Sequence, residues 1–378
     1  MVEKKKAFNI LRCVFYFCWG LLLQAYEMVI PNMKLQPNTL SIIVIICLIL
    51  FMLLNIYVNK TKLSLKEIII TTTFLLFISI VCWHSTISAG LIFSSFLMIF
   101  AFYDLPFGMI LRTFVIFSGI TIFLTLVLNK MGVLASTISF SDYRIRNSLG
   151  FIYYSYGSIL YFSLVSSYLL IRKEKIGYIE LVLLELINIY FFKFTNTRDP
   201  FFFTTIVLLY GLIRKWQKSS NSFLNIRVIR FICKYIYILA FLINIIMIYS
   251  NEKFYDFFNE LVNGRLGLSR LGIEQYGISI WGTKLNFVGA MSGSSYFYID
   301  SFFIQTLLSY GVIVTIFILV LFTMVMKRCI DNNDYYLVFI MCLMALDGVF
   351  EPYILWLWYT PMAFLIGKVV RDSDFEKE

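Results

Sequence analysis

The chain has 378 residues, of which 60% are hydrophobic and only 14% are charged. Soluble domains carry about 25% charged residues, so this composition excludes an ordinary water-soluble fold. The net charge of +10 does not indicate a nucleic-acid partner, because most basic residues fall in segments that can be assigned to one membrane face. Apolar runs of about 20 residues recur, each long enough to cross a bilayer as a helix. The alternating pattern of a membrane barrel is absent, so we expect an all-α polytopic integral membrane protein.

Twelve transmembrane helices are predicted, and they form a single integral membrane domain over residues 1–378. In chain order the predicted spans cover 8–30, 39–58, 67–84, 86–103, 108–128, 151–171, 176–194, 200–216, 231–250, 301–326, 334–350 and 352–370. The first follows a basic stretch, as in a signal peptide, but it runs on without a small-residue cleavage site and is interpreted as an uncleaved helix. The last two meet at Glu351-Pro352, because proline disfavours a helical conformation in the residue before it.

The distribution of basic residues predicts the orientation of these spans. With a cytoplasmic N-terminus, 22 of the 32 Lys and Arg residues fall on the cytoplasmic side. The positive-inside rule therefore predicts a plasma-membrane protein with both termini in the cytoplasm. Segment 251–300, between the ninth and tenth spans, is then extracytoplasmic. The ten other cations are also external, and most of them cluster in segments 138–151, 193–202 and 251–300.

Segment 251–300 interrupts the apolar pattern and is the large extracytoplasmic loop. Loops of this length are usually functional or disordered, and its aromatic and leucine content argues against disorder. After Arg265, apolar residues recur at roughly helical spacing, at Leu268, Leu271, Tyr276 and Ile280. This spacing predicts an amphipathic helix at the membrane surface that begins near Arg265 and carries Arg270 on a more polar face.

Arg265 is the strongest single candidate for a functional residue. Gly264 and Gly267 bracket it, which would allow the backbone to approach a ligand closely. The alternative is that Arg265 and Arg270 are simply solvated charges.

Arg146 and Arg198 each precede a predicted helix at the outer surface. Arginine can hold phosphate oxygens with two parallel hydrogen bonds, and the free N–H groups at a helix start also favour anions. Arg146 therefore indicates an anion site, helped by Arg144, or alternatively an anchor at the membrane interface. Arg198 likewise combines an arginine with a predicted helix start, for which Asp199 is the predicted cap. The alternative is that Arg198 forms only a local ion pair with Asp199.

Several acidic residues are candidates for proton transfer. Asp300 closes the long loop, where it could cap the next helix or act as a general base that deprotonates a sugar hydroxyl. Asp347 lies inside an apolar segment, where a charge is costly, so it should be paired or functional. Weaker candidates are Glu27, Glu274 and Glu351.

No metal site or cofactor is predicted. His84 is the only histidine, and it is interpreted as a packed or interfacial residue. The seven cysteines lie in or beside apolar spans without a CxxC pair, so we expect them to pack as small apolar residues. Neither GxSxG nor a P-loop pattern is present.

Three local patterns resemble those of the Wzy-like bacterial polysaccharide polymerases, relatives of the O-antigen ligase superfamily. They are RNSLGF at Arg146–Phe151, NTRDPF at Asn196–Phe201, and NGRLGLSRLGIEQYG followed by IWG and YIDSFFIQTLLSYGVI within Asn263–Ile313. The last pattern includes the pair Tyr310-Gly311. The resemblance covers roughly residues 140–315 and is carried by the order of these motifs together with loop size and topology.

The resemblance implies a glycosyltransferase architecture of the GT-C type and an inverting, metal-independent glycosyl transfer at the outer face of a bacterial plasma membrane. The implied substrates, donor and acceptor, are oligosaccharide repeat units on undecaprenyl pyrophosphate. The residues that match pyrophosphate-binding arginines are Arg146, Arg198, Arg265 and Arg270, with Arg265 and Asp300 as the catalytic pair. Implied partners are membrane lipids, a chain-length regulator and a flippase.

Two alternatives remain at this stage. A flippase for lipid-linked oligosaccharides would also have about twelve spans, but its charges should line a central path and it needs no long outer loop. A ligase-type transferase of the same superfamily usually has a histidine in the large loop, and segment 251–300 of this chain has none.

Overall fold

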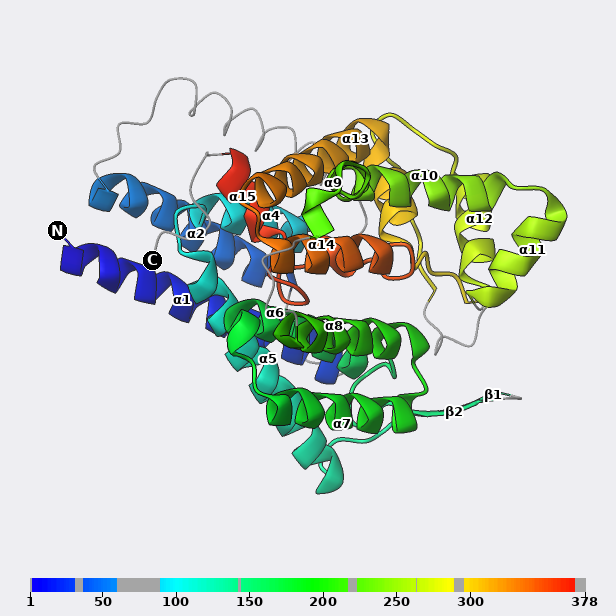
Figure 1. The fold of residues 1–378 in the computed structure, drawn as a ribbon, viewed down its shortest axis with the longest axis horizontal. Coiled ribbons are helices and arrows are strands. Elements are labelled where there is room, and N and C mark those ends of the chain that lie inside the picture. Colours follow the sequence, from blue (N-terminus) through cyan, green and yellow to red (C-terminus); the bar gives the residue numbers. More distant parts are fainter. Residues whose placement is uncertain are drawn as a thin grey trace.

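The structure is a computed structural model that describes residues 2–30, 37–59, 89–141, 144–216, 223–262, 264–288 and 296–370. The protein is mostly helical, and the described ranges contain fourteen α-helices and one two-stranded antiparallel sheet (Figure 1). Many of the helices run along the long axis of the molecule. Helices α11 and α12 and the sheet lie at one end of that axis, and the N-terminus lies at the other (Figure 1).

The described helices are named here in chain order. The first seven are α1 (Val2–Gln24), α2 (Pro37–Asn59), α4 (Ala89–Ala101), α5 (Phe107–Lys130), α6 (Tyr156–Arg172), α7 (Tyr178–Thr195) and α8 (Arg198–Trp216). The others are α9 (Arg227–Lys234), α10 (Ile236–Tyr249), α11 (Glu252–Leu261), α12 (Arg265–Tyr276), α13 (Phe302–Asp331), α14 (Tyr335–Asp347) and α15 (Phe364–Val370). Single turns are η1 (Ala25–Val29), η2 (Lys173–Lys175), η3 (Phe223–Asn225) and η4 (Tyr353–Leu355), and the strands are β1 (Ile138–Ser141) and β2 (Arg144–Asn147).

Within the described ranges, three helices are long and apolar enough to cross a membrane: Glu3–Val29, Phe107–Lys130 and Phe302–Asp331. Helices α9 and α10 meet at an angle of 70°, and if this bent pair is counted as one span, up to four helices could cross a membrane. Other predicted spans coincide with helices that are too short, such as α6 and α14, or too charged, such as α7 with Glu180, Glu185 and Lys193. The predicted span 67–84, with His84, lies outside the described residues.

The predicted continuous span over 352–370 is wrong. The chain forms the short turn η4, then irregular backbone, then the seven-residue helix α15. Pro352 and Pro361 explain the interruption, because neither has an N–H to donate within a helix. The segment is nevertheless buried almost throughout. Non-helical backbone at membrane depth is tolerated only where protein surrounds it, which is the case here.

Helix α1 supplies partners for this buried segment. The Tyr16 hydroxyl donates to the carbonyl of Leu357 at 2.8 Å, and Nε2 of Gln24 donates to the carbonyl of Trp358 at 2.7 Å. A glutamine inside an apolar span is costly unless it is hydrogen-bonded. Gln24 is thus tolerated in the first span, because it donates a hydrogen bond to the carbonyl of Trp358, which lies in non-helical backbone.

Helix α13 is interrupted near its start by Gly311, at φ 84° and ψ 175°. Part of the long loop, residues 279–283, lies against this interruption. The N–H of Thr283 donates to the carbonyl of Leu308 at 2.8 Å, and the N–H of Val312 donates to the carbonyl of Ser279 at 3.1 Å. Loop backbone thus replaces helical hydrogen bonds that the break removes.

Two glycines make this contact possible. A Cβ atom on Gly282 would overlap the carbonyl oxygen of Ser309, and one on Gly311 would overlap the carbonyl oxygen of Ile280. Both glycines have positive φ, 86° and 84°. Only glycine combines that conformation with so close an approach of two backbones.

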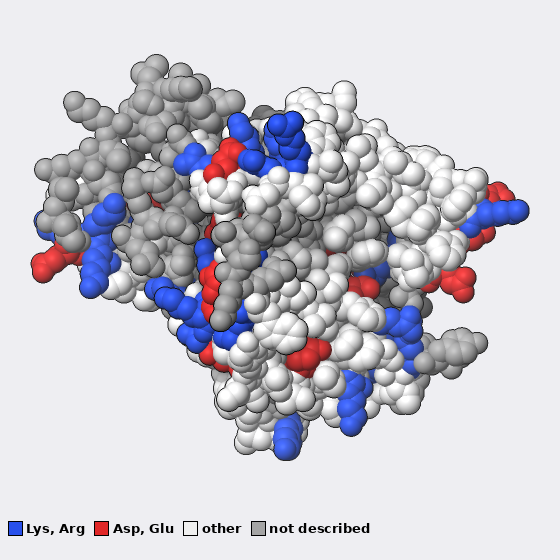
Figure 2. All heavy atoms as spheres, viewed as in Figure 1, with Lys and Arg blue, Asp and Glu red and all other residues white. Residues whose placement is uncertain are grey.

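Charged side chains gather at two ends of the molecule, with few between them over α10 and α14 (Figure 2). At the end nearer the N-terminus, Arg12 pairs with Asp104 at 2.6 Å, and Nζ of Lys368 donates to the carbonyl of Leu105 at 2.6 Å. At the other end, α11 begins with Glu252 and Lys253, both exposed. A sparsely charged stretch over α10 and α14 between charged zones is the pattern expected of a protein surrounded by lipid.

Candidate functional site

Arg265 begins helix α12, as the sequence predicts, and Gly264 caps the helix in the left-handed conformation at φ 82°. The predicted apolar stripe is only partly correct, because Leu271 and Ile280 are 47% and 58% exposed. The packed side of α12 is instead Leu266, Ser269 and Gly272. Here Gly272 meets the Ile299 side chain, where a Cβ atom would be too close.

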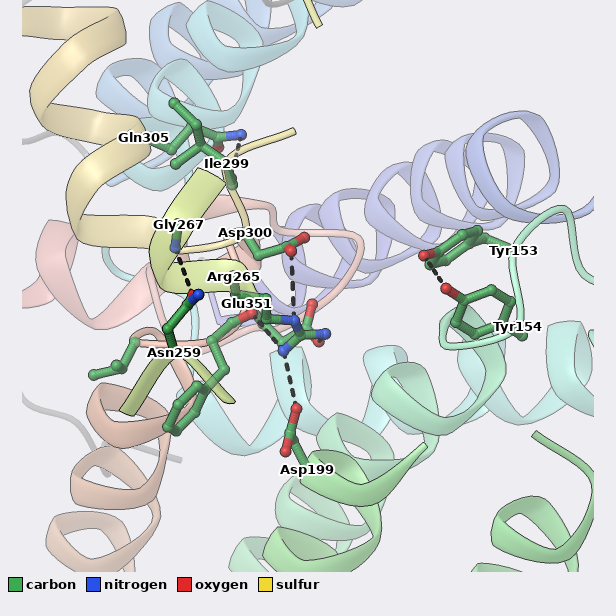
Figure 3. Close-up of polar contacts among 12 residues, drawn as sticks. Tyr153, Tyr154, Asp199, Asn259, Arg265, Gly267, Ile299, Asp300, Gln305 and Glu351 are labelled. Carbon is green, nitrogen blue, oxygen red and sulfur yellow. Dashed lines mark hydrogen bonds and ion pairs between the residues drawn. The ribbon is translucent and has the colours of Figure 1, made fainter. Parts of the chain in front are cut away.

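Gly267 serves helix packing. Its N–H donates to Oδ1 of Asn259 on α11 at 2.7 Å (Figure 3), and a Cβ atom there would touch Asn259 and Tyr255. These contacts explain Gly267 by the packing of α12 on α11, and approach of a ligand at this position stays a prediction.

The Arg265 guanidinium lies among three carboxylates (Figure 3). Nη1 is 2.9 Å from Oδ2 of Asp199, Nη2 is 3.1 Å from Oε1 of Glu351, and Nε is 3.4 Å from Oδ2 of Asp300. Nη1 also donates to the carbonyl of Phe350 at 2.9 Å. We call Arg265, Asp199, Asp300 and Glu351 the acidic cluster. It joins the start of α8, the start of α12, the end of the long loop and the turn after α14.

The acidic cluster has one cation for three acids, so protonation of an acid is favoured. Burial raises the pKa of Asp300 to about 6, against the opposing effect of Arg265, and Asp199 raises it further. Burial also raises the pKa of Glu351 well above its usual value, although Arg265 opposes this. The side chain of Glu351 is only 3% exposed, whereas that of Arg265 is 24% exposed. A carboxyl that titrates close to neutral pH is suited to accept or give a proton.

Asp347 lies one helical turn before Glu351, at the end of α14. It is buried, its charge interacts with those of Asp199 and Arg265, and its Oδ1 has no hydrogen-bond partner among the residues that the structure describes. Asp347 therefore lies close enough to the acidic cluster to interact with its charges, and among the described residues it forms no ion pair with Arg265. A functional role for Asp347 stays a prediction.

A group of three arginines lies beside the acidic cluster: Arg144, Arg146 and Arg198. Burial and the charges of Arg198 and Arg146 lower the pKa of Arg144, while Asp199 raises it, which places these side chains in one electrostatic neighbourhood. The Arg146 guanidinium lies over the ring of Tyr154, 4.5 Å from its centre, and its Nε is buried without a partner among the described residues. We call these three residues the arginine group.

Arg146 reaches this position on a β-hairpin that the sequence pattern does not predict. Strands β1 and β2 pair with Ser139 opposite Arg146, and a turn follows. The predicted helix start near Gly150 is wrong: Gly150 has φ 89°, and α6 begins only at Tyr156. The helix N–H groups expected next to Arg146 are therefore not there. Tyr153 and Tyr154, which hydrogen-bond to each other, occupy that turn (Figure 3).

Two predicted helix caps are wrong. Ser301, not Asp300, caps α13 by accepting from the N–H of Ile304. Asp199 does not cap α8, because that helix begins at Arg198 and Asp199 lies within its first turn. The chain uses both aspartates for Arg265 instead. The sequence predicts Asp199 as a cap or as a local partner of Arg198, so its ion pair with Arg265 was not predicted.

Arg270 does not join either group. It is 45% exposed, its Nε lies 3.2 Å from Oε1 of Glu274, and its guanidinium lies over the ring of Tyr255. The structure therefore brings together Arg146, Arg198, Arg265 and Asp300 of the predicted site residues, and leaves Arg270 on the solvent side of α12 as the spacing predicted. Among the weaker candidates for proton transfer, Glu351 belongs to the acidic cluster. The only sequence feature that distinguishes Glu351 is its position before Pro352, at the predicted turn between two spans.

The cavity next to Arg265 is small, about 10 Å³, which is room for about one water molecule. Its polar lining is Arg265, Asn244 on α10, Ser269 and Ser301, and its apolar lining is Met247, Val262, Leu266, Val349 and Phe350. No protein-family model, curated protein or solved structure matches this chain.

Protonation of Asp300 should make folding stability depend on pH. Because its pKa is raised from 3.8 to about 6, the folded state holds the proton more tightly than the unfolded state. The free energy of unfolding should therefore fall as pH rises from about 4 to about 6 and level off above that range. Thermal unfolding of purified wild type and Asp300→Asn across this range measures the effect.

Asp300→Asn should show a weaker dependence of the free energy of unfolding on pH than wild type. Asp256 is an exposed aspartate on α11, so Asp256→Asn should keep the wild-type dependence. Equal slopes in wild type and Asp300→Asn would contradict the raised pKa.

Proposed function

We propose that the chain is a membrane glycosyltransferase that polymerises oligosaccharide repeat units linked to undecaprenyl pyrophosphate. One observation carries the proposal: an acidic cluster and an arginine group lie side by side at one end of an apolar helical protein. Transfer of a sugar from pyrophosphate to a hydroxyl needs both a base and a set of fixed cations. The resemblance of the Arg146, Arg198 and Arg265 segments to Wzy-like polymerases, a GT-C-type architecture and a fold of about twelve spans are part of the same proposal.

The contacts support different roles for Arg265 and for the arginine group. Nη1, Nη2 and Nε of Arg265 all face acids, so we assign Arg265 to holding Asp300 and Glu351 in place. Arg146 and Arg198, together with Arg144, then bind the donor pyrophosphate, which arginine forks suit. Asp199 connects the two, because it pairs with Arg265 from the residue next to Arg198.

The proposed step is a single displacement. The Asp300 carboxylate takes the proton of the acceptor hydroxyl, and the hydroxyl oxygen attacks the anomeric carbon of the donor. The bond from that carbon to the pyrophosphate oxygen breaks, the configuration inverts, and the charge on the leaving pyrophosphate is stabilised by the arginine group. No step requires a metal ion or cofactor.

The proposed topology places this end outside the plasma membrane. It is supported by Lys173, which follows α6 at the end opposite Tyr156 and pairs with Asp334 at the start of α14, whereas Glu351 follows the other end of α14. Both termini are then cytoplasmic. Donor and acceptor lipids, a flippase that delivers them and a chain-length regulator are the proposed partners.

A strain that lacks the protein tests the function. It should export single repeat units but build no long chains, and the wild-type gene should restore the ladder of chain lengths on a gel. Repeat units retained on the cytoplasmic side would indicate a flippase instead. Long chains that form but are not attached to their final acceptor would indicate a ligase, and either result would reject the polymerase.

A further inference from the structure

A second site lies at the opposite end of the molecule from the acidic cluster. A cavity of about 420 Å³ opens where α5 begins, α6 ends and α14 begins. Helices α6 and α14 each run from this cavity toward the acidic cluster, since Tyr156 and Asp347 lie at their other ends. At 1.5 Å per residue, these helices separate the two sites by about 20–25 Å. The cavity is therefore independent of the proposed active site.

The walls of the cavity are of two kinds. Its apolar lining is Pro106, Phe107, Leu111, Leu170, Ile171 and Leu337. Its charged lining is Arg112, Lys173 and Asp334. The cations outnumber the acid, and the first turn of α5 adds the positive end of a helix dipole. Such a cavity suits an anion joined to an apolar group, and its volume falls within the range of about 300–1,000 Å³ that is typical of ligand sites.

Lys173 is held at the cavity by an unusual backbone conformation. It follows the last residue of α6 at φ 45° and ψ −127°, which an L-residue adopts at a cost of about 1–3 kcal/mol. Its Nζ lies 3.1 Å from Oδ2 of Asp334, and the Lys173 side chain keeps about a third of its surface exposed. The preceding Arg172 is held elsewhere by Glu180 at 2.6 Å and does not line the cavity.

We propose that this cavity binds a phosphate group, with Lys173 and Arg112 as its cationic ligands and the apolar wall holding a hydrocarbon chain attached to it. Two sources share this chemistry: an anionic lipid head group and a free phosphate. The lipid fits both kinds of wall, whereas free phosphate uses the charged wall alone. The proposal does not depend on the function of the acidic cluster.

Gly108 offers a way to fill the cavity without damaging the fold. It lines the cavity within the first turn of α5, and a Cβ atom there would have nothing within 4 Å. A leucine at this position should therefore occupy the space while also favouring the helix, because glycine is the poorer helix former. Gly108→Leu removes the cavity volume. The double change Arg112→Ala/Lys173→Ala removes the positive charge. Arg172→Ala is the matched control, because Arg172 does not line the cavity.

The test uses the purified full-length protein in phosphatidylcholine nanodiscs, titrated with dihexanoyl phosphatidic acid, dihexanoyl phosphatidylcholine or inorganic phosphate. We expect phosphatidic acid to bind more tightly than phosphatidylcholine, and the double variant to weaken it about 10-fold to 30-fold. Gly108→Leu should weaken the binding of phosphatidic acid at least as much, with an unchanged or higher thermal midpoint, and Arg172→Ala should leave the binding unchanged. If the double variant is unstable, Gly108→Leu alone decides the matter.

The outcomes separate the two sources. Tighter binding of phosphatidic acid than of inorganic phosphate, lost in Gly108→Leu, supports a lipid site. Equal binding of both, lost only with the cations, supports a free-phosphate site. Binding that is the same in wild type and in both cavity variants, or that is weakened equally by Arg172→Ala, overturns the proposal.

Discussion

Replacement of Arg265 by alanine should abolish long polymer and also lower the stability of the protein. Arg265 is the cation that faces Asp199, Asp300 and Glu351. Removing one partner of a buried ion pair typically costs about 3–5 kcal/mol, because the remaining charge stays buried without compensation. Part of this cost should be recovered by protonation, so the loss of stability should be smaller at pH 5 than at pH 8.

The measurement combines a chain-length gel with thermal unfolding at both pH values and with the abundance of the protein in the membrane. Arg270→Ala is the control, because Arg270 lies on the same helix but is exposed and pairs with the exposed Glu274. It should change stability by no more than about 1 kcal/mol and leave the ladder intact. Arg265→Lys should fall between the two, since lysine keeps the charge but cannot face three carboxylates with a planar fork.

Two results would count against different parts of the account. Long polymer from Arg265→Ala at normal abundance would reject the role of the acidic cluster in catalysis. A wild-type thermal midpoint for Arg265→Ala would instead reject the ion pairs themselves.

Gly311→Ala and Gly282→Ala should each destabilise the protein by about 3 kcal/mol or more. Both positions have positive φ, and in both the added Cβ atom would overlap a carbonyl oxygen of the facing backbone. Strain of the backbone and overpacking each cost about 1–3 kcal/mol, and here they act together because neither backbone can move without breaking hydrogen bonds.

Thermal unfolding in detergent measures this effect, with Gly119→Ala as the control. Gly119 lies within α5, where an added Cβ atom meets only Leu164 at 3.9 Å, an ordinary contact. Alanine there should be neutral or stabilise the helix by up to about 1 kcal/mol. A midpoint for Gly311→Ala that matches the Gly119→Ala variant would show that the break in α13 is not held by the loop.

The sequence predicted much of what depends on local pattern. The first span, the helix that starts at Arg265 and the exposed position of Arg270 all follow from the spacing of neighbouring residues. The hairpin of β1 and β2 was missed because strands of four residues leave too short an alternation to recognise.

The acidic cluster could be predicted only in part, for a different physical reason. Arg265 and Asp300 were found because cations and acids are conspicuous in a loop between apolar spans. Glu351 and Asp199 meet Arg265 across 86 and 66 residues of chain, and no local pattern records such a contact. The irregular segment after Pro352 was missed because its apolar composition is that of a membrane helix, although protein rather than lipid surrounds it.

The hydrogen bonds between residues 279–283 and the break in α13 have a mechanical consequence. Arg265 stands on one side of that junction in the chain and Asp300 on the other, so both are tied to the same piece of backbone. The long loop cannot swing outward as a hinged cover without exposing the carbonyl of Leu308 and the N–H of Val312. Opening of the acidic cluster by separation of residues 279–283 from α13 would therefore break these hydrogen bonds.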